Sequence, residues 1–342
     1  MTSSSPMSTI LHRLRLLRKL WELERRRKGG LPDPMLLARG FLTNRAWLYP
    51  FDRYDRTLFL TDLEIEARLP RLNGAEVREL LGDKRRFHRW ASANGLPTAR
   101  LIGIVENGRV TTPEGQMLDR PTIAEVGAIA KPVDGSGGFG VRVVHSLTEL
   151  PAFGHFLLEE RLVQHDYASR VYPAAVNTVR VMVGRLGDGD PVILGAAHRF
   201  GTDLSAPTDN FKAGGIVSLV ALDTGHLSEA VIDAGGPDRV TLAHHPSTLA
   251  RIAGTRVPYW QSVLALALAA TRALPGLTYV GWDIAVSPSG PIIVEGNAGL
   301  ANPNLVQFHR PILLEPEARR FFAGTGVISP RRLRDIEAVA SR

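Results

Sequence analysis

Hydrophobic and polar residues alternate over short runs through the middle of the chain, and Gly, Pro and Asn turns separate these runs. This two-residue period is typical of β-strands with one buried face, whereas a few segments show the longer period of a helix. The mixture predicts an α+β fold with mostly antiparallel sheets. The predicted helices cover 74–81, 83–94 and 258–274, the predicted strands cover 57–61, 99–105, 129–133, 141–145, 156–162, 178–185, 192–200 and 216–222, and a hairpin covers 280–297.

The first thirty residues show a different pattern. From Thr9 to Lys28 apolar residues recur at helical spacing with basic residues around them, which predicts an amphipathic basic helix that ends at Gly29-Gly30. Residues 8–28 could dock on an anionic membrane surface or on a protein partner. The alternative is a terminal helix that packs on its own domain and leaves a solvated charged face.

The composition excludes several kinds of site and of membrane attachment. No cysteine is present, which excludes disulfides, thiolate metal sites and a cysteine nucleophile. No apolar run reaches the roughly 18 residues that a membrane-spanning helix needs. Basic residues interrupt every N-terminal stretch that could form the core of a signal peptide, so we expect a cytoplasmic protein, peripheral at the membrane if the basic helix docks there.

The formal net charge of +7 is concentrated at the two ends of the chain. Residues 8–30 contribute +6 and residues 330–342 contribute +2, which leaves −1 for the middle. Binding to nucleic acid requires a basic groove that neutralises phosphates. We therefore expect no nucleic-acid partner.

Residues 131–141, with the sequence KPVDGSGGFGV, contain a dense glycine cluster. Glycines let backbone amides approach a phosphate that a Cβ would block. The cluster fits the GxGxxG spacing, but a predicted strand follows it where a dinucleotide-binding motif needs a helix, and it lacks the Lys-Ser or Lys-Thr of a P-loop. A strand, a glycine loop and a second strand, with Lys131 on the first strand, are typical of a lid over a triphosphate. An ordinary glycine-rich hairpin turn is the alternative.

The hairpin predicted over 280–297 carries two acids that pair across its strands. With a connection of three or five residues, Asp283 lies opposite Glu295 and Asn297 points to the same face, whereas a two-residue connection would put Gly296 opposite Asp283. Two carboxylates in such a pair repel each other, and a bound cation relieves the repulsion. Oxygen ligands of this type suit Mg²⁺. A solvated hairpin face with acids there by chance is the alternative.

Several motifs occur in a characteristic order: Asp83-Lys84, Lys131-Pro132 with the glycine loop, Glu159-Glu160, Asn177 to Arg180, Asp209 to Gly215, Gly281-Trp282-Asp283 and Glu295-Gly296-Asn297. This set resembles the ATP-grasp enzymes over about residues 75–310. Within that superfamily it is most similar to the sugar-transfer-associated ATP-grasp family, and next to the glutamate-ligase-like branch. The resemblance implies an ATP-grasp fold, in which two α+β subdomains with antiparallel sheets clamp ATP.

The resemblance also implies roles for particular residues. Lys84 and Lys131 would neutralise phosphates, and Gln164 would be a candidate ribose ligand. The implied catalytic residues are Arg180, Arg199 and Lys212, and the implied ligands of Mg²⁺, or of Mn²⁺ as the alternative ion, are Asp283, Glu295 and Asn297. The implied ATP-binding residues are Lys84, Lys131, Ser136, Gly137, Gly138, Gly140, Glu159, Glu160, Leu162, Gln164 and Asn210.

On this basis we expect an ATP-dependent carboxylate ligase that joins a small-molecule carboxylate to an amine or another nucleophile. A small-molecule kinase on the same scaffold, and a nucleotide-binding adaptor recruited by its basic helix, are the alternatives. The identities of donor and acceptor, and the oligomeric state, do not follow from the sequence. The expected regions are a basic helix (1–30), an atypical N-terminal region (31–95), a small ATP-binding subdomain (96–163), a large subdomain with the metal site (164–329) and a basic tail (330–342).

Overall fold

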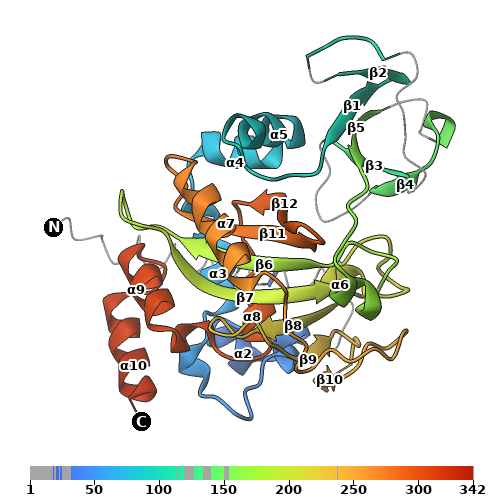
Figure 1. Ribbon diagram of the computed structural model, residues 1–342. Helices are drawn as coiled ribbons and strands as arrows, with labels where there is room; N and C mark the ends of the chain where they lie inside the picture. Colours follow the sequence, from blue (N-terminus) through green and yellow to red (C-terminus); the bar gives the residue numbers. More distant parts are fainter. Residues whose placement is uncertain are drawn as a thin grey trace.

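Two antiparallel sheets form the centre of the computed structural model (Figure 1). The structure describes Arg18, Trp21, Glu22, Glu24 and residues 32–341, apart from 113, 119–126, 134–139, 150–153 and 237. The smaller sheet has the strand order β2-β1-β5-β3-β4, and the larger has the order β10-β9-β8-β7-β6-β11-β12. This arrangement confirms the predicted α+β class.

The strands of the smaller sheet are β1 (Leu101–Glu106), β2 (Arg109–Thr111), β3 (Ala128–Pro132), β4 (Arg142–Val144) and β5 (His155–Glu160). Those of the larger sheet are β6 (Thr178–Gly184), β7 (Val192–Phe200), β8 (Ile216–Val220), β9 (Leu227–Ile232), β10 (Val240–Leu242), β11 (Tyr279–Ser287) and β12 (Gly290–Asn297). The α-helices are α2 (Pro34–Ala38), α3 (Asp62–Arg68), α4 (Ala75–Gly82), α5 (Lys84–Ala93), α6 (Asp166–Val171), α7 (Trp260–Arg272), α8 (Asn304–Gln307), α9 (Pro316–Gly324) and α10 (Pro330–Ala340). Short 3₁₀ helices are η1 (Thr43–Leu48), η2 (Arg56–Leu58), η3 (Leu69–Arg71), η4 (Leu147–Glu149), η5 (Phe211–Ala213) and η6 (Ile312–Leu314).

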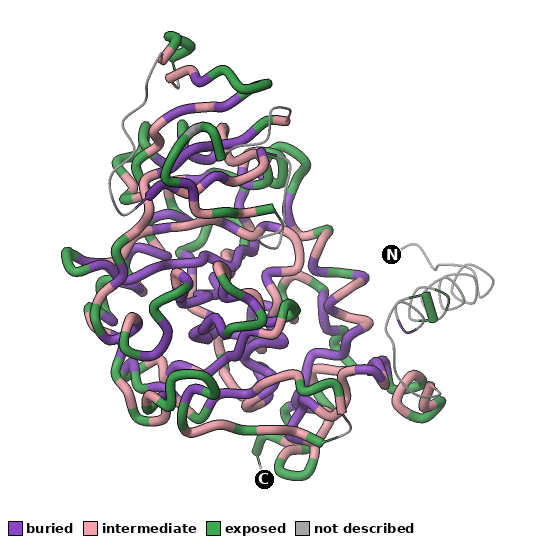
Figure 2. Tube along the Cα trace, turned by 90° about the vertical axis from the view of Figure 1, so that its right-hand side faces the viewer, coloured by how far each residue is buried: buried purple, intermediate pink, exposed green. Residues whose placement is uncertain are grey.

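The larger sheet is covered on both faces. Helices α4 to α7 pack against one face, where they contact alternate residues of β6 such as Val179 and Val181. Residues 41–69 and helices α8 to α10 pack against the other face, which presents Met182. Every residue of β6 is therefore buried, and Figure 2 shows buried chain through the body of the molecule.

One predicted strand is wrong. The segment predicted as a strand over 57–61 instead overlaps η2 and ends at Thr61, the residue that precedes α3. Thr61 caps α3: its side chain accepts a hydrogen bond from the backbone N–H of Glu64, and the Glu64 carboxylate accepts one from the backbone N–H of Thr61. This capping box outweighs the β-propensity of the preceding residues.

The expected basic tail is mostly helix α10, which packs on the domain. Ile336 on this helix is fully buried. Arg332 donates hydrogen bonds to the carbonyls of Thr57 and Phe59, at 2.9 and 2.7 Å. The basic residues at this end of the chain are therefore partly structural.

Most of the predicted basic N-terminal helix lies outside the described residues. The buried Glu24 is described, and its carboxylate accepts a hydrogen bond from the backbone N–H of Thr43 at 3.1 Å. Among the residues that the structure places, no helix has the length and apolar character to cross a membrane.

Candidate functional site

A cavity of about 670 Å³ is lined by residues of both sheets, of α4 and α5, and of the segments 207–212 and 298–302. Its walls therefore come from segments far apart in the sequence. The predicted site residues that line it are Lys84, Lys131, Glu159, Glu160, Leu162, Arg180, Arg199, Asn210, Lys212, Asp283, Glu295 and Asn297. Ser136, Gly137 and Gly138 lie outside the described residues. Gly140 is described at a φ of 74°, and a Cβ there would come within 2.9 Å of Cγ of Pro132.

Three charged residues form a row across adjacent strands of the larger sheet. Arg180 on β6 pairs with Asp283 on β11, and Asp283 pairs with Glu295 on β12. The connection of this hairpin is two residues long rather than three or five, because Ser287 pairs with Gly290. The predicted pairing of the acids nevertheless holds, because the register shifts between Asp283 and Ile284.

The row lies within a buried cluster of ion pairs. The Nε and Nη2 atoms of Arg180 contact the two carboxylate oxygens of Asp283 at 2.5 and 2.8 Å. Nη2 of Arg199 lies 2.8 Å from Oδ2 of Asp283 and 3.2 Å from Oδ1 of Asp209. Nδ2 of Asn297 donates to Asp283 and Glu295, at 3.3 and 3.1 Å. The two guanidinium groups thus contact the carboxylates of Asp283 and Asp209, and Asn297 links Glu295 to the cluster.

The three carboxylates differ in how readily they ionise. Burial opposes ionisation of Asp283, but Arg180 and Arg199 outweigh it and hold the pKa of that carboxyl well below its usual range. Burial and the charge of Asp283 together raise the pKa of Glu295. Burial likewise raises the pKa of Asp209 in spite of Arg199. Three acids face two arginines, so the cluster carries excess negative charge when all the acids are ionised.

The donor chemistry of this cluster fits a divalent cation in part. Glu295 and Asn297 provide oxygen ligands, and a cation would offset the repulsion that raises the pKa of Glu295. Both carboxylate oxygens of Asp283, in contrast, accept hydrogen bonds from guanidinium groups. In the described part of the chain no set of three or more His, Asp and Glu side chains is arranged to hold a metal ion.

Another charged group lies on the smaller sheet. Nζ of Lys131 on β3 lies 2.6 Å from the carboxylate of Glu159 on β5, and Nε2 of His88 on α5 lies 2.8 Å from the same carboxylate. Burial alone would raise the pKa of Glu159, but Lys131 and His88 lower it to about 2. Nζ of Lys84 donates to the carbonyl of Pro132 at 2.9 Å. Both lysines are therefore fixed at the cavity wall.

The structure gives Gln164 a different role from the ribose ligand that the resemblance implied. Its amide nitrogen donates to the carbonyls of Tyr172 and Ala175, and its oxygen accepts from two nitrogens of Asn177, all at 3.0 Å. Gln164 is buried and does not line the cavity. Its hydrogen bonds join segments of the chain, so we remove it from the candidate site.

Arg78, Thr178 and Asp209 are among the lining residues that were not candidates. Asp209 begins a motif that the sequence singled out, and its carboxylate accepts hydrogen bonds from the backbone N–H and hydroxyl of Thr178, at 2.9 and 2.5 Å. Thr178 lies two residues before Arg180 on β6 and thus on the same face. No sequence signal distinguished Arg78 from the other arginines of the helical region.

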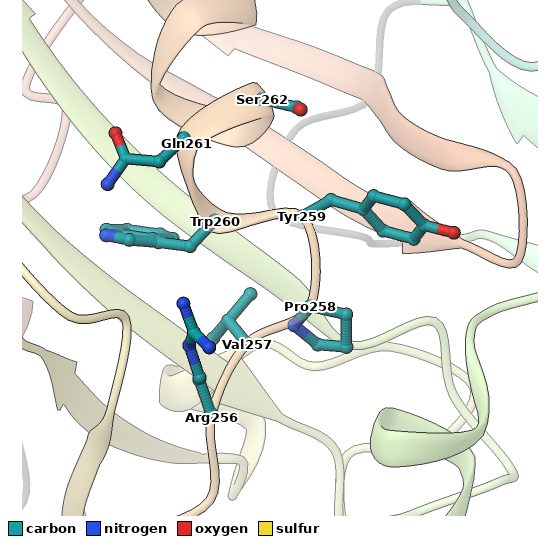
Figure 3. Close-up of a pocket in the computed structure, with 7 residues that line it drawn as sticks. All are labelled: Arg256, Val257, Pro258, Tyr259, Trp260, Gln261 and Ser262. Atoms are coloured by element: carbon teal, nitrogen blue, oxygen red, sulfur yellow. The ribbon is translucent and has the colours of Figure 1, made fainter.

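A second hollow of about 400 Å³ lies at the start of α7, where Arg256–Ser262 form its wall (Figure 3). Its lining comes from one continuous segment, and none of the predicted site residues belongs to it. The candidate chemistry is concentrated in the larger cavity.

Residues 144–310 match the family described as sugar-transfer associated ATP-grasp. The chain carries an ATP-grasp domain. The matched segment includes β6, β7, β11 and β12, which hold the buried ion-pair cluster of this domain. No curated protein matches the chain in sequence.

Several solved structures resemble parts of the chain. An L-amino acid ligase from Bacillus licheniformis is 12% identical, with a TM-score of 0.40 over 67% of this chain and 43% of that one. Biotin carboxylase from Campylobacter jejuni is 13% identical, with a TM-score of 0.43 over 74% and 48%. N5-carboxyaminoimidazole ribonucleotide synthetase from Thermotoga maritima is 13% identical, with a TM-score of 0.36 over 68% and 48%. The chain thus spans less than half the length of each of these proteins.

Proposed function

We propose that this protein is an ATP-dependent ligase that activates a carboxylic acid as an acyl phosphate and couples it to an amine or another nucleophile. ADP and phosphate are the other products. The observation that carries the proposal is the cluster of Arg180, Arg199, Asp283 and Glu295, because it lines the same cavity as Lys84 and Lys131. Such a cavity suits a reaction between a triphosphate and an anionic substrate.

Lys84, at the start of α5, and Lys131, on β3 of the smaller sheet, bind the phosphates of ATP. The carboxylate of Glu159, ionised at neutral pH, holds the ammonium group of Lys131 in place through their 2.6 Å ion pair. Glu160, at the end of β5, and Leu162, two residues further on, line the cavity and contact the nucleoside. The described wall of this side therefore supplies positive charge for phosphates and an apolar contact for a base.

On the larger sheet, Arg180 and Arg199 stabilise the charge that develops on the transferred phosphoryl group and on the substrate carboxylate. A guanidinium fixed in advance stabilises negative charge that develops on nearby oxygens. Asp283 and Asp209 hold the two guanidinium groups in place before substrate arrives, which lowers the cost of orienting them during the reaction. Asn210 and Lys212 line the adjoining wall and bind the acid that is activated.

Glu295 and Asn297, with Asp283, would hold Mg²⁺, or Mn²⁺ in its place. When bound, the ion supplies charge neutralisation for the phosphates and orients them for in-line transfer. The carboxylates of Asp209, Asp283 and Glu295 together exceed the positive charge of the two arginines, which favours binding of a divalent cation.

Variants of the two hairpin acids test the proposal. Glu295→Gln and Asp283→Asn are each expected to reduce Mg²⁺-dependent ATP turnover at least 100-fold, the scale on which removing a preorganised charged group acts. Asp190→Asn, at an exposed acid outside the cavity, is the matched control and is expected to retain turnover. Thermal melting separates lost activity from lost folding, because Asp283→Asn leaves Arg180 with a weaker buried partner.

The same assay, run with hydroxylamine and a panel of carboxylic acids, identifies the reaction. A hydroxamate formed with one acid supports the ligase, whereas a stable phosphorylated product without hydroxamate supports the kinase. Nucleotide binding without turnover for any acid would contradict an enzymatic function and support the adaptor.

We also propose that residues 8–28 dock on an anionic membrane surface, supported by the net charge of +6 over residues 8–30. Co-sedimentation of the full chain with vesicles of phosphatidylcholine and phosphatidylglycerol tests this. The variant with Arg25, Arg26 and Arg27 changed to Glu is expected to remain in the supernatant, and equal partitioning of the two proteins would contradict the proposal.

A further inference from the structure

Arg78 lines the cavity but has no part in the chemistry proposed above. It is an exposed residue of α4 and lies outside residues 144–310, which match the ATP-grasp family. Helix α4 is anchored beside the end of β12. Asn73, just before the helix, donates hydrogen bonds to the carbonyls of Tyr279 and Ala298, at 2.6 and 2.7 Å. Arg78 is therefore held near the end of the strand that carries the hairpin acid Glu295.

The guanidinium of Arg78 is oriented by backbone carbonyls of the segment that precedes α4. Its Nη1 atom donates to the carbonyls of Pro70 and Asn73, at 3.0 and 2.6 Å. Within the described part of the chain, its Nε and Nη2 atoms form no hydrogen bond. This second edge of the guanidinium is the one that binds a carboxylate or phosphate group with two parallel hydrogen bonds.

Arg78 also differs from Arg180 and Arg199 in its ion pairing. Arg180 and Arg199 both contact Asp283. Arg78, in contrast, forms no ion pair with any acid that the structure describes. A cation that lines a cavity, has one edge fixed and lacks an acidic partner is suited to an anionic ligand.

We propose that Arg78 binds an anionic group of the substrate, so that the substrate carries a carboxylate or phosphate group in addition to the carboxylate that is activated. The identity of the ligand as the substrate rests on the proposed function, whereas anion binding by Arg78 does not. The residue would select dianionic acids over monoacids of similar size, because a monoacid leaves its guanidinium edge unpaired.

Binding measured without turnover tests this inference. The protein is loaded with Mg²⁺ and the non-hydrolysable analogue AMP-PNP, and the dissociation constants of succinate, phosphonoacetate and butyrate are measured by ligand-observed NMR. We expect succinate or phosphonoacetate to bind more tightly than butyrate, and the better of the two identifies the second anionic group as a carboxylate or a phosphate. Arg78→Met is expected to weaken binding of that dianion about tenfold, the scale of one solvent-accessible bidentate ion pair.

Two further variants complete the design. Arg86→Met, at an exposed arginine of α5 that pairs with Glu79 at 3.2 Å, is the matched control and is expected to bind the dianion as the wild type does. Arg78→Lys keeps the charge without the bidentate edge, and an intermediate affinity is expected. It also keeps the test informative if Arg78→Met does not fold.

Equal dianion affinity of the wild type and the Arg78 variants, or no binding of either dianion, would overturn the inference. Failure of the proposed function has a different signature, namely Arg78-dependent dianion binding by a protein that turns over no ATP with any acid.

Discussion

Gly281 is required by the close approach of Arg180 to the loop that follows β12. A Cβ on Gly281 would lie 2.6 Å from Cδ of Arg180 and 3.0 Å from both Cβ and the carbonyl oxygen of Ala301. Neither neighbour can move freely, because Arg180 is bonded to Asp283 and to the carbonyl of Ala301, and Ala301 is buried at a φ of 49°. Gly281→Ala must therefore displace the Arg180 side chain.

The expected cost combines two effects. Overpacking a buried site costs about 1 to 3 kcal/mol. Weakening one charge-assisted hydrogen bond of Arg180 adds roughly 1 to 2 kcal/mol. We expect Gly281→Ala to lower the free energy of unfolding by about 2 to 5 kcal/mol and to reduce ATP turnover at least tenfold, since Arg180 leaves its position beside Asp283.

Urea unfolding followed by tryptophan fluorescence measures the first effect, and steady-state ATP hydrolysis measures the second. Gly236→Ala is the matched control, because a Cβ at that loop position meets nothing within 4 Å. If Gly281→Ala unfolds within about 0.5 kcal/mol of the wild type and keeps its turnover, the reasoning that Gly281 makes room for Arg180 is refuted.

Three further predictions concern single residues. The pKa of Glu159 is about 2 in the folded protein, below its ordinary 4.5, so its stabilising contribution is complete above pH 4.5 and is lost as the pH falls towards 2. Glu159→Gln is expected to cost roughly 3 kcal/mol at pH 7 and to flatten this acid decline in chemical denaturation, and an unchanged pH profile would contradict the pairing with Lys131. Asp209→Asn weakens the hold on Arg199 and is expected to lower kcat about tenfold with the KM for ATP within twofold, whereas an unchanged kcat would exclude a positioning role. Gln164→Leu removes four buried hydrogen bonds and is expected to cost about 3 to 5 kcal/mol in urea while leaving the KM for ATP unchanged; a large rise in that KM would restore the ribose contact.

The hairpin acids show what the sequence could predict. The sequence paired Asp283 with Glu295 from the two-residue period of a strand together with an assumed connection of three or five residues. The connection length was not predictable, and the pairing holds only because the register shifts beside Asp283. Such a shift adds one residue on one strand and leaves little trace in the hydrophobic pattern.

Other parts of the site depend on tertiary contacts that a local pattern does not contain. Gln164 follows shortly after β5 of the smaller sheet, next to residues that line the cavity. Its partners Tyr172 and Asn177 become neighbours only when the chain turns back through α6. Arg78 reaches the cavity only because α4 docks on the end of β12, and Arg332 becomes structural only because α10 packs on residues 57–59. Residues of this kind have the same local sequence properties as solvated ones.

The central claim is that a substrate carboxylate attacks the terminal phosphate of ATP in this cavity. Its most direct test uses the acid found in the hydroxamate panel, labelled with ¹⁸O in its carboxylate, in the complete reaction with ATP and Mg²⁺. The released phosphate is then examined by ³¹P NMR. With both carboxylate oxygens labelled, we expect one ¹⁸O atom in the phosphate for each product formed, because the acyl phosphate breaks at its carbonyl carbon when the nucleophile attacks. Phosphate that carries no label, with product still formed, would contradict it.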